Sequence, residues 1–232
     1  MNQSSLNASV FVKKEEEPIF LKDLKKILKF LIFCYKQMVL ISKDKKEVLN
    51  DFGETELNNL LRDLLQSNKW EFALADYYFS REEAESDEKT HKNKGFTDIK
   101  VIIPPPNKIS KENRSFIFEC KRLGKDTKLN NYYIVNGIID RFITGKYCPS
   151  MDTAGMIGFI QKNEKMKTPN IQNIIDDINK KIIDKHNKPE TEKLKNVLIQ
   201  DDFKYSYISE HKRDNDLGNI SLYHLMFDLS FC

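Results

Sequence analysis

The chain has 232 residues, of which 40% are hydrophobic and 31% are charged. This length and composition are typical of one soluble globular domain with a hydrophobic core and a very polar surface. The net charge of +3 is too small for nucleic acid to be bound by bulk charge, so any such binding requires a local basic patch.

Neither a membrane segment nor a zinc site is expected. The longest apolar run near the N-terminus, 31–35, is too short to span a bilayer. The four cysteines are widely spaced and form no CxxC pair, which indicates reduced thiols and a cytoplasmic protein. They are Cys34, Cys120, Cys148 and Cys232.

The chain begins with a polar stretch, 1–17, that we expect to be a flexible tail. Apolar residues then recur every three or four positions, with lysines between them, which predicts an amphipathic helix. The apolar positions are Leu21, Leu24, Ile27, Leu28, Leu31 and Ile32. We favour packing of this helix on the domain, and the alternative is a helix that faces a partner or DNA.

A turn at 50–53 precedes a second helix, 54–66, which has a leucine stripe. Glu54 lies close to that stripe, whereas Glu56 points about 100° away from Leu57. Both acids can also simply favour the N-terminus of the helix electrostatically.

Three strands are predicted next. They are 70–79, then 96–103, which is ended by three prolines, then 115–120. The charged run 81–94 has no periodicity and is expected to be a solvated loop.

Charged residues interrupt the second and third of these strands. Asp98 lies inside one, and Glu119 and Lys121 close the other, on the same face because side chains alternate along a strand. The opposite, core-facing positions are Phe116, Phe118 and Cys120. If Asp98 meets Glu119 across the strand pair, two carboxylates and an ammonium form a site for a divalent cation such as magnesium. A surface hairpin with a salt bridge is the alternative.

Asp98 followed by Glu119-Cys120-Lys121 at the end of an apolar strand resembles the PD-(D/E)XK, or restriction-endonuclease-like, nuclease superfamily. The resemblance implies that Asp98 and Glu119 bind Mg²⁺ (or Mn²⁺) and that Lys121 positions or activates the attacking water. It also implies that a helix acid completes the metal site, with Glu54 as the first candidate and Glu56 as the second. Thr97 stands where the family name has proline.

The rest of the chain predicts a helix around 133–142, a buried strand 153–161, a helix 168–186, a linker 188–195 and a strand or hairpin 197–208. A loop, 209–219, and an apolar closing element, 220–231, follow. The order of three strands, one helix and a further strand fits the core of the resembled superfamily. The expected fold is therefore α/β (α+β): one domain, 18–232, with a central mixed sheet flanked by helices.

Four basic residues are candidates for nucleic-acid binding: Arg141, Lys146, Lys212 and Arg213. A solvated basic loop explains the last two equally well. The histidines show no metal-ligand spacing; His224 is expected in the core, and His91 and His186 at the surface. The run 207–213, with the segments 137–147 and 155–160, also resembles the ends of restriction-like nucleases in bacterial anti-phage systems.

Together these features predict a metal-dependent nuclease that hydrolyses phosphodiester bonds, in DNA by preference, with Asp98, Glu119, Lys121 and Glu54 at its active site. A chain of this length with no visible recognition domain is also compatible with a protein partner or a homo-oligomer. One alternative is a catalytically inactive subunit that keeps the fold and binds nucleic acid or a protein. The other is a scaffold or regulatory protein whose charges are surface ion pairs.

Overall fold

The structure is a computed structural model that describes residues 19–45, 48–81, 84–86, 93–105, 114–124, 127–147, 149–162 and 169–232. The expected tail, 1–17, and His91 and Cys148 lie outside these residues. No helix among the described residues is long and apolar enough to cross a membrane.

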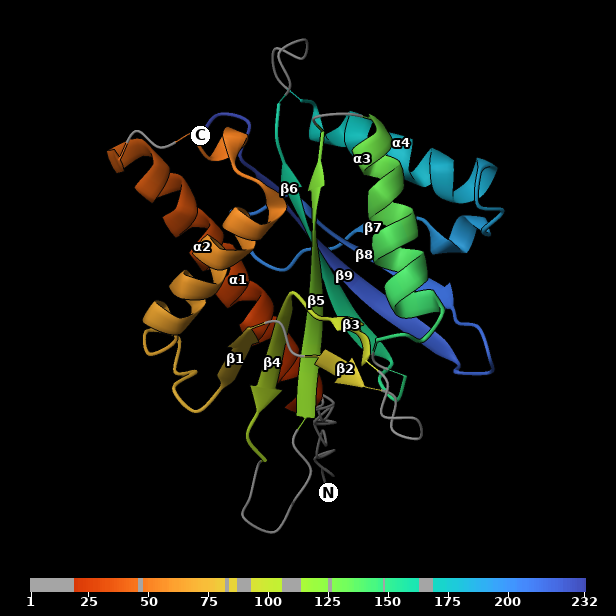
Figure 1. The fold of residues 1–232 in the computed structure, drawn as a ribbon, viewed down its shortest axis with the longest axis horizontal. Helices are drawn as coiled ribbons and strands as arrows, with labels where there is room; N and C mark the ends of the chain where they lie inside the picture. The colour runs from red at the N-terminus through yellow and green to blue at the C-terminus, as the bar shows by residue number, and fades with distance from the viewer. Residues whose placement is uncertain are drawn as a thin grey trace, which may run out of the picture.

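Within the described residues, two helices come first along the chain, a run of strands follows, and further helices then lie between strands, so the fold combines helices with strands (α/β) (Figure 1). The helices are α1 (Ile19–Lys45), α2 (Glu54–Asn68), α3 (Thr127–Tyr132), a π-helix (Tyr133–Ile143) that continues α3, and α4 (Ile171–Asp184). Short 3₁₀ turns occur at Leu49–Asp51 and Glu190–Glu192. The strands are β1 (Tyr78–Arg81), β2 (Ala84–Ser86), β3 (Asn93–Phe96), β4 (Ile99–Ile103), β5 (Arg114–Leu123), β6 (Thr153–Ile160), β7 (Lys195–Asn196), β8 (Ser206–Lys212) and β9 (Asn219–Asp228).

Seven strands form one mixed sheet in the order β1-β4-β5-β6-β9-β8-β7. The central strands β5, β6 and β9 are parallel, and antiparallel strands flank them on both sides. Parallel neighbours need a crossover, and the chain supplies α3 and the π-helix between β5 and β6. The predicted mixed sheet flanked by helices is confirmed.

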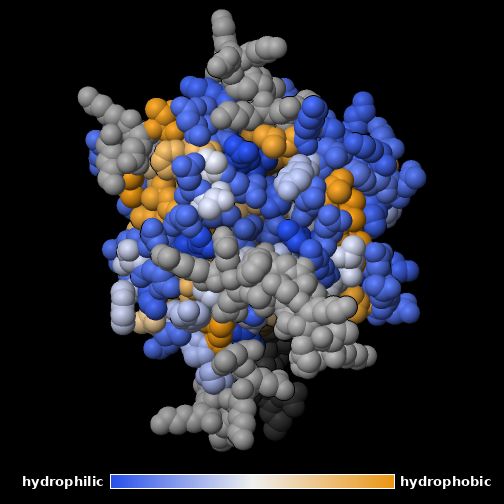
Figure 2. All heavy atoms as spheres, viewed as in Figure 1, coloured by the Kyte–Doolittle hydropathy of each residue, from blue (hydrophilic) through white to orange (hydrophobic). Residues whose placement is uncertain are grey.

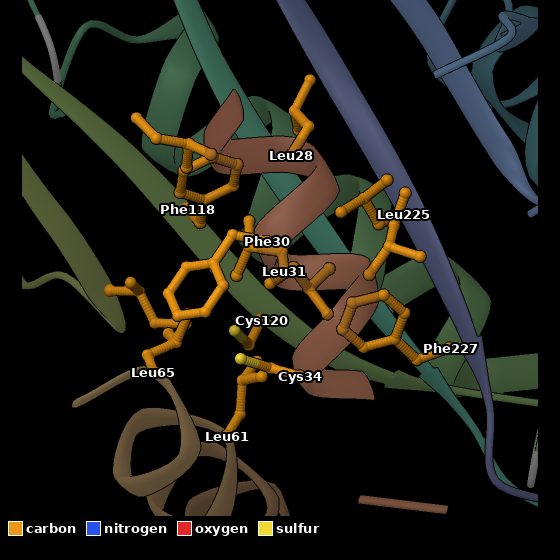
Figure 3. Packing of buried hydrophobic residues seen from close by; sticks show 14 of the residues in the cluster. Leu28, Phe30, Leu31, Cys34, Leu61, Leu65, Phe118, Cys120, Leu225 and Phe227 are labelled. Atoms are coloured by element: carbon orange, nitrogen blue, oxygen red, sulfur yellow. The ribbon is translucent and has the colours of Figure 1, made fainter. Parts of the chain in front are cut away.

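Each face of the sheet is covered by its own hydrophobic cluster. Helices α1 and α2 cover one face, where alternate residues of β5 such as Phe118 and Cys120 meet the apolar stripe of α1 (Figure 3). The π-helix and α4 cover the other face, against Ile117 and Leu123. The apolar face of α1 is therefore packed on the domain, as favoured, while its lysines remain on the opposite side.

The two halves of β5 pair with different strands, one on each edge of β5, and the change occurs at Phe118. Up to this residue β5 pairs with β4, and Ile99 of β4 is opposite Phe118. From this residue onward β5 pairs with β6, beginning at Gly155. A Cβ at Gly155 would lie 2.2 Å from the Phe118 ring, so only glycine fits at this crossing. Beyond Phe118 the β4 side of β5 has no neighbouring strand within the described residues.

Several predicted elements were wrong. Residues 70–77 form turns with an exposed Trp70, and only Tyr78 and Phe79 of the expected first strand lie in a strand, β1. Of the expected strand 96–103, only Ile99–Ile103 forms β4, and Phe96 is the last residue of β3, which pairs with β2 in a separate two-stranded sheet. Asp98 therefore precedes β4 instead of lying inside a strand. The expected loop 209–219 is shorter than predicted, because β8 continues to Lys212 and β9 begins at Asn219.

Candidate active site

The predicted charged residues meet where β5 continues past the end of β4. On this edge the backbone N–H groups of Cys120 and Arg122 lack a strand partner, and carboxylates accept from them. Asp98 Oδ2 accepts from the Cys120 N–H at 2.7 Å, and Glu54 Oε2 accepts from the Arg122 N–H at 3.3 Å. Buried backbone donors must be paired. Because β4 ends before these two N–H groups, the carboxylates of Asp98 and Glu54 accept from them in place of a strand partner.

The ammonium of Lys121 lies among three carboxylates. Its Nζ is 2.8 Å from Glu119, 3.1 Å from Glu54 and 3.9 Å from Asp98. The Lys121 and Glu119 side chains are only 5% and 2% exposed, whereas Glu54 is 30% and Asp98 19% exposed. The site therefore opens to solvent over Glu54 and Asp98, with Glu119 and Lys121 recessed below them. Figure 1 shows this half of β5 between α2 and α3, and in the same view hydrophilic residues cover most of that region (Figure 2).

Arg141 joins the same cluster from the π-helix. Its Nε lies 3.2 Å from Glu119, and its guanidinium lies over the Tyr147 ring, 4.9 Å from the centroid. We predicted Arg141 as a contact to nucleic acid, and the structure places it against a predicted metal ligand. Sequence reasoning could not find this pair because nothing in the spacing of Glu119 and Arg141 shows that the helix returns over the strand.

Burial and crowding shift the pKa values in the cluster. Burial, followed by the charge of Glu119, raises the pKa of the Asp98 carboxyl to about 7. Burial by itself lowers the pKa of Lys121, but the charges of Glu119, Glu54 and Asp98 outweigh it, and the pKa rises. Lys121 is therefore a charged donor at neutral pH.

These residues fit a magnesium ion in part. Within the described ranges, no three His, Cys, Asp or Glu side chains are arranged to hold a metal. However, Mg²⁺ often takes only one or two carboxylates together with waters and substrate phosphates. Glu119 Oε2 is a buried oxygen for which the described residues provide no hydrogen-bond partner. A cation there would gain a ligand and would relieve the repulsion between Asp98 and Glu119.

Of the two helix acids, only Glu54 reaches the cluster. Glu56 turns back and accepts from the Gly53 N–H at 2.6 Å, so it caps α2. The same helix contributes Asn58, whose Nδ2 donates to Asp98 Oδ1 at 3.1 Å. Asn58 was not predicted. It lies one turn after Glu54, on the same side of the helix, and this i, i+4 spacing is the signal that was available.

The predicted basic residues lie near one end of the π-helix. The Asp214 N–H donates to the Ile143 carbonyl at 2.9 Å, which brings the turn after β8 to the end of this helix. Lys146 is half-buried and Lys212 is exposed. Arg213 is buried and donates to the Leu217 carbonyl, so its placement does not favour a contact with nucleic acid.

A buried polar chain runs between β8, β9 and the π-helix, and sequence reasoning missed it. Four contacts of 2.7 Å link Glu192, His211, Ser209, His224 and Tyr133 in that order. All five residues are at most 4% exposed. The expected core position of His224 is confirmed, whereas His211 is not on a surface loop. The Ser-x-His spacing on one strand was the available signal, because it puts both side chains on one face.

One arrangement of protons satisfies this whole chain while both imidazoles are neutral. Burial lowers the pKa of His224 well below its usual value, so this ring is neutral. The Glu192 carboxylate can only accept. Tyr133 then donates to His224, His224 to Ser209, Ser209 to His211, and His211 to Glu192. Ser209, His211 and Glu192 have the order of a hydrolase triad, but Ser209 is 2% exposed, and a substrate cannot reach it.

No protein-family model matches the chain, and searches of curated proteins and of solved structures found no match either.

Proposed function

We propose that this chain is a metal-dependent nuclease with a restriction-endonuclease-like core that hydrolyses phosphodiester bonds in nucleic acid, DNA by preference. The observation that carries this proposal is the convergence of Glu54 from α2, Asp98 from the bend before β4, and Glu119 and Lys121 from β5 where β5 continues past the end of β4. A surface hairpin with an ion pair would leave Glu119 and Lys121 exposed, but both are buried.

The order of elements around the cluster supports the fold part of the proposal. An antiparallel pair, β4 and β5, is followed by a helix and by β6, which is parallel to β5. Helix α2 comes earlier in the chain and supplies the third acid. This is the order that the resemblance to PD-(D/E)XK nucleases implies, with the acid and the lysine on the same strand.

Asp98 and Glu119 would hold Mg²⁺ or Mn²⁺ together with waters and a substrate phosphate, and Glu54 at the mouth of the site would be the third acid beside them. When bound, such a cation supplies a Lewis acid for the phosphate and lowers the pKa of a coordinated water. Lys121 is charged at neutral pH, so it acts as a hydrogen-bond donor that orients the attacking water or a phosphate oxygen, and not as a base. Arg141 adds a second positive charge beside Glu119, where negative charge develops on the phosphate.

In the reaction, a water oxygen attaches to phosphorus and the P–O ester bond breaks. The leaving oxygen takes up one proton, and the net change is the addition of one water. Because Asp98 and Glu54 are the more exposed acids, the phosphate would approach over them, and the recessed ammonium of Lys121 would meet it from below.

Cleavage of plasmid and of labelled oligonucleotides, with Mg²⁺ or with EDTA, tests this function. We expect cleavage by the wild type only with metal, loss of at least a hundredfold in rate for Glu119→Gln and Lys121→Met, and little change for Glu56→Gln, which keeps the cap of α2. Calorimetry adds an independent readout: equal Mg²⁺ affinity in the wild type and Glu119→Gln would refute the metal site. Tight binding of DNA without cleavage would favour the non-cutting subunit instead.

A further inference from the structure

An exposed aromatic ring borders the candidate site. Lys121 Nζ lies 5.9 Å from the centroid of the Tyr132 ring, within the range of a cation–π contact. Tyr132 is 47% exposed, although its neighbour in the cluster, Tyr147, is fully buried. Of these two tyrosines beside the charged residues, only Tyr132 therefore offers its ring to a ligand.

The orientation of Tyr132 is fixed from the buried side. It is the last residue of α3, and the next residue, Tyr133, starts the π-helix with its hydroxyl bonded to His224. Consecutive helical residues point about 100° apart. Because Tyr133 is anchored in the core through the chain of buried hydrogen bonds, Tyr132 is directed away from it, toward Lys121 and solvent.

The depth of the site constrains the substrate. Glu119 and Lys121 are almost fully buried, so a phosphate must be drawn down between Glu54, Asp98 and Arg141 to reach them. The base attached to that phosphate then lies near the rim, where Tyr132 presents its ring. In a duplex the bases are paired and stacked inside the helix and cannot stack on a protein side chain, whereas bases of a single strand stack readily on aromatic rings.

We propose that Tyr132 is a stacking platform for an unpaired nucleobase next to the scissile phosphate, so that the substrate is single-stranded nucleic acid. This inference rests on the proposed function and specifies its substrate class. Lys128 indicates the path that the nucleic-acid strand would follow along α3. It is exposed and lies one turn before Tyr132, on the same side of the helix. A strand that stacks on Tyr132 can place a neighbouring phosphate near the Lys128 ammonium.

Binding in EDTA separates this inference from the cleavage reaction. We would measure fluorescence anisotropy of a labelled single-stranded 12-mer, of the same strand with one abasic position moved along it, and of the duplex. Stacking on one base contributes a factor of about ten to a hundred in affinity. Tyr132→Ala is therefore expected to lose about that factor for the single strand, and Tyr132→Phe, which keeps the ring, to remain within about threefold of wild type.

The abasic strands identify the stacked base. In the wild type, an abasic site at the stacked position should lower the affinity by the same factor as Tyr132→Ala does. In Tyr132→Ala, the same abasic site should lower the affinity no further. Trp70→Ala, which removes an exposed ring in the turns after α2, is the matched control and should not change affinity. Tyr133→Phe keeps the core ring but removes the hydroxyl that anchors it, and should weaken single-strand binding by a few-fold.

The outcomes separate the two proposals. Unchanged binding of the single strand by Tyr132→Ala, tighter binding of the duplex than of the single strand by the wild type, or no binding of any probe overturns the stacking platform. If the binding results are as expected but no metal restores cleavage, the nuclease proposal fails and the base-binding site stands. If duplex is cleaved and the Tyr132 variants bind like wild type, the nuclease proposal stands and this inference fails.

Discussion

The Asp98 carboxylate accepts the backbone N–H of Cys120 at 2.7 Å, so a side chain in front of β4 completes the hydrogen bonding of β5. Asp98 thus has a structural role as well as its proposed role as a metal ligand. The two roles conflict when no cation is present, because the carboxylate is buried beside Glu119 and its pKa is raised to about 7. The conflict lowers the free energy of unfolding of the metal-free protein, which can be measured.

We expect Asp98→Asn to stabilise the protein in EDTA at pH 8 by on the order of 2–4 kcal/mol, and to abolish cleavage. A raised carboxyl pKa means that the folded state binds more protons than the unfolded state between about pH 4 and pH 7. Its stabilising effect is present below the unfolded pKa and is lost as pH rises through 7. Asparagine keeps an acceptor for Cys120 but has no charge.

Urea unfolding of both proteins from pH 4 to pH 8 checks this. The advantage of Asp98→Asn should shrink to almost nothing near pH 4, where the wild-type carboxyl is protonated in the folded state and begins to be protonated in the unfolded state as well. Asp140→Asn changes an exposed aspartate of the π-helix and serves as the control. An Asp98→Asn protein that is less stable than the wild type at pH 8 would contradict the buried-charge argument.

Lys121→Met should have the opposite effect on stability. It removes the ammonium between three carboxylates and leaves their charges uncompensated, and such losses are typically about 3–5 kcal/mol. In EDTA at pH 8 the variant should therefore melt well below the wild type. Mg²⁺ should raise its Tm by more than it raises that of the wild type, because the cation replaces the lost charge. Equal Tm shifts would indicate that Mg²⁺ does not bind at this cluster.

The charged residues of the site could be predicted from the sequence, because Asp98, Glu119 and Lys121 interrupt apolar runs and strand alternation orders the last two. Their partners could not. Arg141 meets Glu119 only because the π-helix crosses back over β5, and this depends on tertiary packing. The same limit applies to Glu192, which lies in an expected linker and is buried by its contact with His211.

The strand 70–79 was predicted wrongly for a related reason. Its aromatic residues satisfy the pattern of a strand, but Trp70 is 69% exposed in a turn, while Phe72 packs against Phe30 of α1 with ring centroids 4.9 Å apart. Aromatic content therefore indicated residues that contact the core, and not the backbone conformation that brings them there.

Comparing Glu54→Gln with Glu56→Gln tests the choice between the helix acids. Glu54 contacts the Lys121 ammonium and the Arg122 N–H, whereas Glu56 caps α2. We expect Glu54→Gln to slow cleavage at least tenfold and to weaken Mg²⁺ binding, and Glu56→Gln to stay within about twofold of the wild type in both. Initial rates across a Mg²⁺ titration measure the two effects together. A larger loss in Glu56→Gln would reverse the assignment.

The buried chain from Tyr133 to Glu192 should make stability depend on pH. The pKa of His224 is lowered by burial, so below about pH 6.5 the unfolded state binds a proton that the folded state does not. Stability is then full above pH 6.5 and falls by up to about 1.4 kcal/mol per pH unit below it. The difference in unfolding free energy between wild type and His224→Gln, followed from pH 7.5 to 5, isolates this contribution. His186→Gln, at a half-buried position, should show a smaller slope.

The last prediction concerns how nucleic acid is held. The loop that follows the π-helix carries Lys146, and the neighbouring Tyr147 lies under the Arg141 guanidinium, so a phosphate entering the site passes close to this lysine. Each lost phosphate contact should flatten the plot of log affinity against log salt by about one unit and weaken all sequences alike. We expect this for Lys146→Ala and, if the strand continues along the turn after β8, for Lys212→Ala. Arg213→Ala should instead lower the Tm, because Arg213 is buried. If both lysine variants keep the wild-type slope, the nucleic acid takes another path, and the lysine side of α1 is the next surface to mutate.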